Sequence, residues 1–160
     1  MSEYKFCKKG CCKYEVKSYN KNQFTPKPSI KAGVFIFDND QKKILLVQSR
    51  GNLWGSPKGS KEENETVMEC ALREVKEETG LELESNLIND NCKFIYNNSH
   101  YYSLNIPENP VSMDAPMIGN DATGIGWFHI NCLIDLIHTE KIKINYHCRL
   151  LLEYFLKIRL

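Results

Sequence analysis

Three glutamates in the middle of the chain could act together as metal ligands. Glu74, Glu77 and Glu78 occupy offsets of zero, three and four within a 23-residue segment that runs from Gly59 to Leu81, GSKEENETVMECALREVKEETGL. On an α-helix these positions share one face, so the three carboxylates converge. Carboxylates held together repel one another unless a hard cation lies between them. The spacing therefore predicts a helix edge that binds a hard cation, although a lone acidic run is more often a solvated helix face.

The same segment has the features of a helix that packs inward. Apolar side chains recur at i, i+3, i+4 and i+7 on the neighbouring face, at Met68, Ala71, Leu72 and Val75. Asn64 is the expected N-cap, and Gly80 stands where a helix C-terminus favours a residue that tolerates positive φ.

The segment resembles the Nudix hydrolases. Their signature is a glycine, five residues, Glu, seven residues, and then Arg-Glu-aliphatic-x-Glu-Glu-x-Gly-aliphatic. This chain fills every fixed position, with Gly59, Glu65, Arg73, Glu74, Val75, Glu77, Glu78, Gly80 and Leu81. The resemblance implies an α/β fold, the Nudix-type α/β/α sandwich, with a mixed β-sheet and the Nudix loop-helix at its centre. It also implies a pyrophosphohydrolase that needs Mg²⁺ or Mn²⁺ to cleave a phosphoanhydride bond.

The resemblance suggests roles for further residues of the segment. The backbone carbonyl of Gly59 is expected to join the three glutamates as a metal ligand, since glycine allows the backbone to approach an ion closely. Arg73 lies off the carboxylate face, so we expect it to pair with the glutamates and hold their rotamers. Glu65, expected in the first helical turn, would do similar orienting work or compensate the helix dipole.

The residues before the helix resemble the mRNA-decapping branch of the family. The loop WGSPKG, from Trp54 to Gly59, is similar to that branch's WGxPKG, and YSLNIP (Tyr102–Pro107) and DATGIGWFHI look like its strands. This implies capped RNA as the substrate, cut to 7-methylguanosine diphosphate and 5′-monophosphate RNA. Trp54 and Lys58 are the expected substrate contacts, with Lys58 reaching a phosphate unless it is a solvated lysine.

Other assignments remain open at this point. Diadenosine polyphosphate hydrolases and diphosphoinositol polyphosphate hydrolases use the same signature with similar loops. A catalytically idle Nudix binding module is disfavoured because the glutamate spacing is intact. In decapping enzymes an acidic residue ahead of the last strand serves as general base or additional metal ligand. Asp121 takes that place here, with Asp114 and Glu108 as reserves, unless Asp121 simply forms an Asn-Asp turn.

The elements that must position these groups alternate along the chain. Strands are expected at Ser29–Phe37, Lys43–Gln48, Asn52–Gly59 (with a tight loop), Lys93–Tyr96, Tyr101–Ile106 and Ile125–Ile130, and two further helices at Cys132–Ile137 and Tyr146–Leu156. Residues 107–122 form a long proline-containing loop. Residues 1–28 are lysine-rich and closed by prolines, which predicts a basic arm outside the core, and residues 29–160 form the hydrolase domain.

Charge is distributed unevenly although the net charge is only +1. Residues 61–84 carry nine acids against three bases, and residues 1–31 carry eight lysines against two glutamates. An acidic, metal-binding centre within a basic frame suits a polyphosphate or RNA substrate. No apolar stretch is long enough to span a bilayer and no signal-peptide pattern is present, which predicts a cytoplasmic protein (host cytoplasm if viral) with no membrane partner. The sequence specifies no oligomeric state.

Seven irregularly spaced cysteines argue against a disulfide framework and for a reducing compartment. Cys7, Cys11 and Cys12 cluster as CKKGCC, a poor fit to the paired C-x-x-C of zinc knuckles. A structural Zn²⁺ on these N-terminal cysteines would need a fourth ligand, such as His147, Cys148 or Cys92. Reduced thiols are the favoured interpretation.

Overall fold

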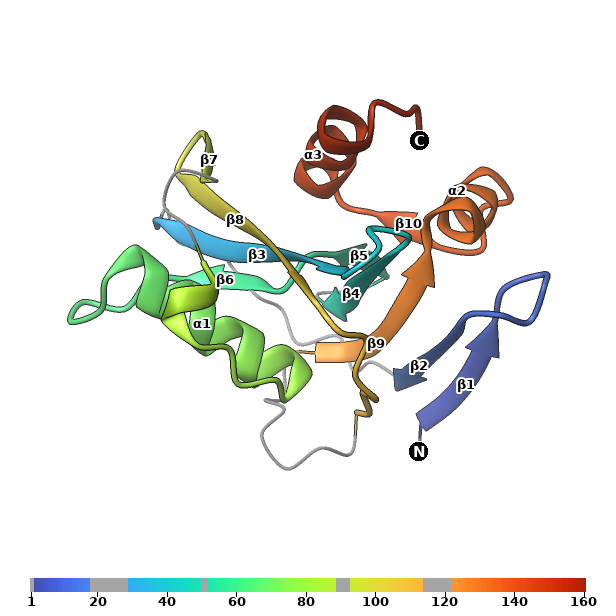
Figure 1. The fold of residues 1–160 in the computed structure, drawn as a ribbon, viewed down its shortest axis with the longest axis horizontal. Helices are drawn as coiled ribbons and strands as arrows, with labels where there is room; N and C mark the ends of the chain where they lie inside the picture. The colour runs from blue at the N-terminus through green and yellow to red at the C-terminus, as the bar shows by residue number, and fades with distance from the viewer. Residues whose placement is uncertain (1, 18–28, 50–51, 89–92, 114–121) are drawn as a thin grey trace.

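The computed structural model describes residues 2–17, 29–49, 52–88, 93–113 and 122–160. They form one mixed β-sheet with helices on both faces (Figure 1). The strands are β1 (Ser2–Phe6), β2 (Lys13–Lys17), β3 (Lys31–Asp38), β4 (Lys43–Ser49), β5 (Leu53–Gly55), β6 (Lys58–Ser60), β7 (Phe94–Tyr96), β8 (Ser99–Ile106), β9 (Ala122–His129) and β10 (Lys143–Ile144). The α-helices are α1 (Val67–Thr79), α2 (Ile130–His138) and α3 (Tyr146–Leu156), and η1 (Ser85–Leu87) is a short 3-10 helix.

The sheet combines parallel and antiparallel pairs, as predicted. Its main path runs β1-β2-β9-β4-β3-β8-β7. The central pair β3–β8 is parallel, and the other neighbours along this path are antiparallel. The expected hairpin between the first two core strands is present as β3–β4, with Ile36 opposite Leu45. The short strands β5 and β6 branch from this path, because β5 pairs with β4 and β10 while β6 pairs with β3.

Side chains along the central strands point alternately to the two faces of the sheet, and this divides the core into two apolar clusters. Val34 and Ile36 of β3 pack in the cluster that contains Cys70, Ala71 and Val75 of α1. Phe35 and Phe37, one residue out of phase, pack in the cluster that contains residues of α2 and α3, among them Leu133, Leu136, Leu151 and Leu152. Successive side chains of a strand point to opposite faces, so a strand buried on both sides reads as a continuous apolar run. The predicted α/β/α sandwich is confirmed.

The N-terminal segment differs from the prediction. Residues 2–17 are not an arm outside the core: β1 and β2 form a hairpin, and β2 pairs with β9 through Tyr14↔Gly126 and Val16↔Gly124. Tyr14 is buried and packs against the rings of Trp54 and Phe128, with centroids 5.6 Å and 5.1 Å away. Gly126 allows this approach, because a Cβ there would lie 2.5 Å from the Tyr14 Cβ. The lysine-rich composition concealed a strand whose partner lies more than 100 residues away. Residues 18–28 lie outside the described part of the chain.

The other predicted elements are present to within a few residues, whereas β10 and η1 were not predicted. The helix expected at Cys132–Ile137 spans Ile130–His138, and the last helix has the predicted bounds Tyr146–Leu156. Within the expected loop 107–122, residues 107–113 are neither helix nor strand, residues 114–121 are not described, and Ala122 already belongs to β9. None of the helices among the described residues is long and apolar enough to cross a membrane.

Candidate active site

The ends of α1 are defined by two local signals. Thr66 is the N-cap: its side chain accepts from Glu69 N at 3.1 Å, while the Glu69 carboxylate accepts from Thr66 N at 2.7 Å. This reciprocal capping box satisfies two backbone donors at the helix start, so the N-cap lies two residues after the predicted N-cap Asn64. Gly80 ends the helix at φ 77°, as predicted.

The loop before α1 lies directly against the central strand β3. Lys58 pairs with Gly33, and Gly59 pairs with Ala32. A Cβ on Gly33 would lie 2.6 Å from both the Lys58 Cβ and the Pro57 oxygen, and Val34 N donates to that oxygen at 3.1 Å. The absence of a side chain at Gly33 therefore allows the loop to pack on the sheet.

Gly59 and Glu74 meet at the base of the site. A Cβ on Gly59 would lie 2.1 to 2.3 Å from the carboxylate atoms of Glu74, so that carboxylate rests directly over the glycine. The Gly59 carbonyl accepts a weak hydrogen bond from the Cys70 thiol at 3.7 Å. A side chain at position 59 would displace Glu74, so glycine is the residue that fits there without moving that carboxylate.

The three glutamates share one pocket but differ in burial. Glu74 and Glu78 are buried, with 9% and 6% relative exposure, whereas the Glu77 side chain is 48% exposed. Glu78 accepts from the backbone N–H of Lys58 at 3.1 Å, which joins the helix to the loop. The three carboxylates line a single pocket together with Lys58, Gly59, Ser60, Lys61 and Arg73. All three carboxylates therefore border one pocket, as residues at positions i, i+3 and i+4 of a helix can.

Arg73 links the glutamates of the Nudix signature to the loop that precedes α1. Its Nε and Nη2 donate to the two oxygens of Glu65 at 2.9 and 2.7 Å. Its Nη1 donates to Glu74 and Glu77 at 2.8 and 3.1 Å, and Nη2 also reaches the Ser60 carbonyl at 3.0 Å. The expected pairing of Arg73 with glutamates of the signature is observed. Glu65, however, precedes the N-cap Thr66 and is not in the first helical turn, so its partner is Arg73 rather than the helix dipole.

The electrostatics of these groups follow from their partners. The bidentate hydrogen bonds from Arg73 lower the pKa of Glu65 to about 2, and the same pairing raises the pKa of Arg73. Burial raises the pKa of Glu74, although the adjacent Arg73 guanidinium opposes that effect. A buried carboxylate with a raised pKa is ionised more readily when a cation compensates its charge.

The donor set fits Mg²⁺ or Mn²⁺. Three carboxylates from α1 and a neighbouring glycine carbonyl supply hard oxygens, the ligands that these ions prefer. The ligand atoms of these three glutamates, all among the described residues, do not gather within 4.8 Å of one another as those of the cysteine group do. Arg73 Nη1 pairs with both Glu74 and Glu77. Gly59, Glu74, Glu77 and Glu78 remain the predicted ligands.

The two predicted substrate contacts differ in their position: Lys58 borders the carboxylate pocket, whereas Trp54 does not. The Trp54 side chain is 2% exposed and packs against Tyr14 and Phe128 in the core, so it does not lie with the carboxylates. Lys58 lines the carboxylate pocket, but its Nζ donates to the Tyr101 hydroxyl at 3.2 Å. That hydroxyl lies 2.7 Å from Nδ1 of His147. Sequence reasoning missed this chain of polar groups, because its members lie 43 and 46 residues apart and no motif connects them.

The expected general base is not placed by the structure. Asp121 and its reserve Asp114 lie outside the described residues. The other reserve, Glu108, forms an ion pair with Lys43 at 2.9 Å and does not line the carboxylate pocket.

Comparisons with known proteins agree with this geometry. The family model of the NUDIX domain matches residues 27–146. "Putative hydrolase 111R" of Invertebrate iridescent virus 3 is 38% identical over 157 residues, which cover 89% of each chain. The mRNA-decapping enzyme subunit 2 of Saccharomyces cerevisiae (strain YJM789) is 32% identical over 116 residues, 69% of this chain but only 12% of that longer protein.

A solved structure shows the same fold. The NUDIX domain of Shewanella oneidensis NrtR, in a cocrystal structure with ADP ribose, matches with a TM-score of 0.59 at 20% identity, covering 81% of this chain and 86% of that one. The complete glutamate signature, the loop-helix that carries it and the match over residues 27–146 together show that this chain belongs to the Nudix family and is a Nudix pyrophosphohydrolase.

Proposed function

We propose that this Nudix enzyme removes the 5′ cap of RNA, releasing 7-methylguanosine diphosphate and leaving 5′-monophosphate RNA. The observation that carries the proposal is the 32% identity to a yeast mRNA-decapping subunit over 69% of this chain. The WGSPKG loop adds support, because its last residues form β6 and border the carboxylate pocket.

The chain's own groups account for a phosphoanhydride hydrolysis. A Mg²⁺ or Mn²⁺ ion on Glu74, Glu77, Glu78 and the Gly59 carbonyl would neutralise phosphoryl charge and lower the pKa of bound water. Arg73 holds Glu74 and Glu77, and Glu65 in turn holds Arg73. Asp121 is proposed to take the proton of the attacking water, because it directly precedes β9.

A second pocket offers a path for RNA phosphates. Lys5 and Lys17 of the β1–β2 hairpin line it together with Lys141 and Lys143 near β10. Glu140 also lines this pocket, but the four lysines leave it with a net positive charge that would attract a polyanion independently of its sequence. The basic N-terminal segment would thus contact RNA as part of a folded hairpin rather than as an extended arm.

A substrate panel tests the proposal. Purified protein with Mg²⁺ or Mn²⁺ is incubated with capped RNA, cap dinucleotide, diadenosine tetraphosphate and a diphosphoinositol phosphate, and the products are identified. We expect 7-methylguanosine diphosphate from capped RNA at the highest kcat/KM, and almost none from Glu78→Gln. Faster turnover of either small phosphate compound would assign the chain to those hydrolases instead. No turnover of any compound would favour the idle binding module, which the intact glutamate pocket argues against.

The proposed contact between RNA and the pocket lined by these four lysines can be tested separately. Deleting residues 1–28 would remove two strands, so substitutions are preferable. Lys5 and Lys143 are exposed, and Lys5→Gln/Lys143→Gln should weaken binding of long capped RNA several-fold while cap dinucleotide cleavage is unchanged. The difference should shrink as salt rises. Lys42→Gln/Lys157→Gln, which removes the same two charges at exposed lysines outside this pocket, is the matched control; equal losses in both variants would refute the assignment.

A further inference from the structure

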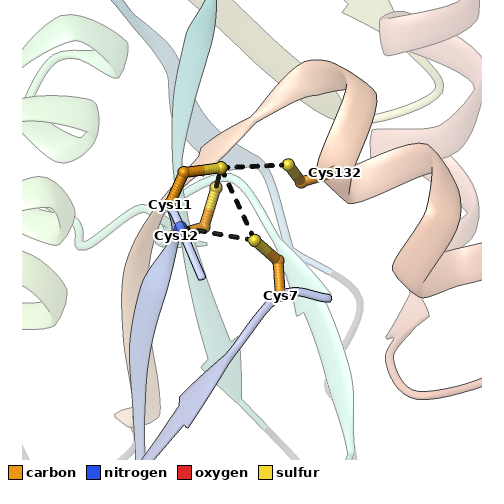
Figure 2. Close-up of side chains that lie close together, drawn as sticks. All are labelled: Cys7, Cys11, Cys12 and Cys132. Carbon is orange, nitrogen blue, oxygen red and sulfur yellow. Dashed lines mark hydrogen bonds between the residues drawn. The ribbon is translucent and has the colours of Figure 1, made fainter. Parts of the chain in front are cut away.

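Four cysteines converge on one point far from the carboxylate pocket. Cys7, Cys11 and Cys12 lie in the loop that joins β1 to β2, and Cys132 lies in the first turn of α2 (Figure 2). Their four Sγ atoms all lie within 4.8 Å of one another. Among the residues that the structure describes, no other group of three or more Cys, His, Asp or Glu side chains brings its ligand atoms so close together.

The separations of the sulfurs match a tetrahedral metal site. Cys11 Sγ lies 3.6 Å from Cys7 Sγ, 3.8 Å from Cys12 Sγ and 3.4 Å from Cys132 Sγ. Zinc–sulfur bonds of about 2.3 Å in a tetrahedron place the sulfurs about 3.8 Å apart. A disulfide would instead bring two of them to about 2.05 Å, and all four thiols are free. The sulfurs are therefore spaced for a single ion rather than for a covalent bond between two of them.

The backbone around the cluster orients the sulfurs. The N–H of Cys12 donates to Cys7 Sγ at 3.4 Å, and the N–H of His129 donates to Cys12 Sγ at 3.1 Å. Such donors stabilise thiolates and hold ligands in one rotamer. Gly10, at φ 74°, lets the hairpin loop turn tightly enough to present three cysteines on the same side.

The surroundings suit a thiolate site that is closed but reachable. Cys7, Cys12 and Cys132 are buried, whereas Cys11 is exposed, so an ion can enter from solvent. Lys8 and Lys9 line the adjoining pocket together with Asp135. The two lysines outnumber the one acid and would offset part of the net charge of −2 that four thiolates leave around a divalent ion. An iron–sulfur cluster, in which the cysteines ligate different iron atoms, would hold its sulfurs further apart than these.

We propose that Cys7, Cys11, Cys12 and Cys132 bind one Zn²⁺ ion as a tetrathiolate site that fastens the β1–β2 hairpin to α2. Binding releases the thiol protons to solvent and changes no oxidation state. The fourth ligand is neither His147 nor Cys148, the described residues that the sequence suggested. His147 pairs with Tyr101, and Cys148 is buried on α3. Cys92 lies outside the described residues. Cys132 supplies the fourth sulfur, which the CKKGCC segment does not contain. The proposed zinc site replaces the earlier interpretation of these cysteines as inert, reduced thiols.

Metal content and spectroscopy test the site directly. Protein reconstituted with Zn²⁺ in the presence of excess Mg²⁺, which saturates the glutamate site, is desalted and analysed by plasma mass spectrometry. We expect one Zn²⁺ per chain. Reconstitution with Co²⁺ should give the intense d–d bands and sulfur-to-metal charge-transfer absorption of a tetrahedral tetrathiolate.

Matched variants make the outcome decisive. Cys11→Ser changes an exposed side chain and should fold, yet lower zinc affinity at least 100-fold; Cys132→Ser should do the same. Cys148→Ser, at a second buried helical cysteine of the same apolar cluster, should keep one Zn²⁺ per chain. Removal of Zn²⁺ should lower the melting temperature of the wild type but not of Cys11→Ser. A wild type that retains no zinc, a cobalt spectrum without thiolate bands, or equal zinc in Cys11→Ser would overturn the proposal, whatever the substrate of the enzyme.

Discussion

The pairing of Glu65 with Arg73 makes a quantitative prediction about stability. Arg73 holds both oxygens of Glu65, at 2.7 and 2.9 Å, and these bonds lower the pKa of Glu65 to about 2 from its usual 4.5. A tenfold change in a proton-binding constant corresponds to about 1.4 kcal/mol, so ionised Glu65 stabilises the fold by at most about 3 kcal/mol. The Arg73 side chain is 24% exposed, and solvent screening reduces the expected value to about 2 kcal/mol.

Glu65→Gln removes the charge while keeping the shape of the side chain. At pH 7 we expect the free energy of unfolding to fall by about 2 kcal/mol, which corresponds to a melting temperature lower by about 4 to 8 °C. Because the folded pKa is depressed, this contribution is fully present above pH 4.5 and is lost as the pH falls toward 2. The difference in the free energy of unfolding between wild type and variant should therefore shrink by about 1 kcal/mol per pH unit below 4.5.

Urea unfolding between pH 7 and pH 3, followed by circular dichroism without added divalent cations, measures both quantities. Glu63→Gln, at an exposed glutamate of the same loop, is the control and should change stability by less than about 0.5 kcal/mol. If Glu65→Gln is as stable as the wild type at pH 7, or if the gap between them does not narrow in acid, then no ionised Glu65–Arg73 pair stabilises the fold.

Three further predictions concern the hydrolytic site. Glu78→Gln removes a charged ligand and should lower kcat about 100-fold or more, with an unchanged circular dichroism spectrum; near-normal turnover would contradict the metal mechanism. Gly59→Ala places a Cβ 2.1 Å from the Glu74 Cδ, so Glu74 must move; we expect weaker Mn²⁺ binding by calorimetry and at least a tenfold loss of kcat, and wild-type values for both would show that the site tolerates a side chain there. Asp121→Asn should lower kcat much more than it raises KM, whereas a larger effect of Asp114→Asn or Glu108→Gln would move the general base to one of those residues.

The sequence by itself determined the catalytic family and the local structure of its helix. The offsets of Glu74, Glu77 and Glu78 depend only on helical periodicity, so a shared face follows from the chain alone. Gly80 ended the helix where expected, because the need for positive φ is a property of one residue. The β-branched and aromatic residues of Ser29–Phe37 likewise predicted a strand, which is present as β3.

Tertiary structure decided the partners that lie far apart in sequence. Lysine content made residues 1–28 look like an arm, but Tyr14 becomes core only because Gly126 of a distant strand makes room for it. Trp54 belongs to a motif that resembles a substrate loop, yet its ring is buried by Tyr14 and Phe128. Contacts of this kind depend on packing between elements, which no local pattern encodes.

The cysteines show most clearly the difference between what the sequence determines and what tertiary structure determines. CKKGCC supplies three sulfurs from one tight loop, and nothing in that spacing identifies a fourth ligand. Cys132 joins them from 121 residues away because β2 pairs with β9, and β9 leads directly into α2. A metal site needs ligands fixed in three dimensions, whereas a sequence fixes only the order in which they occur.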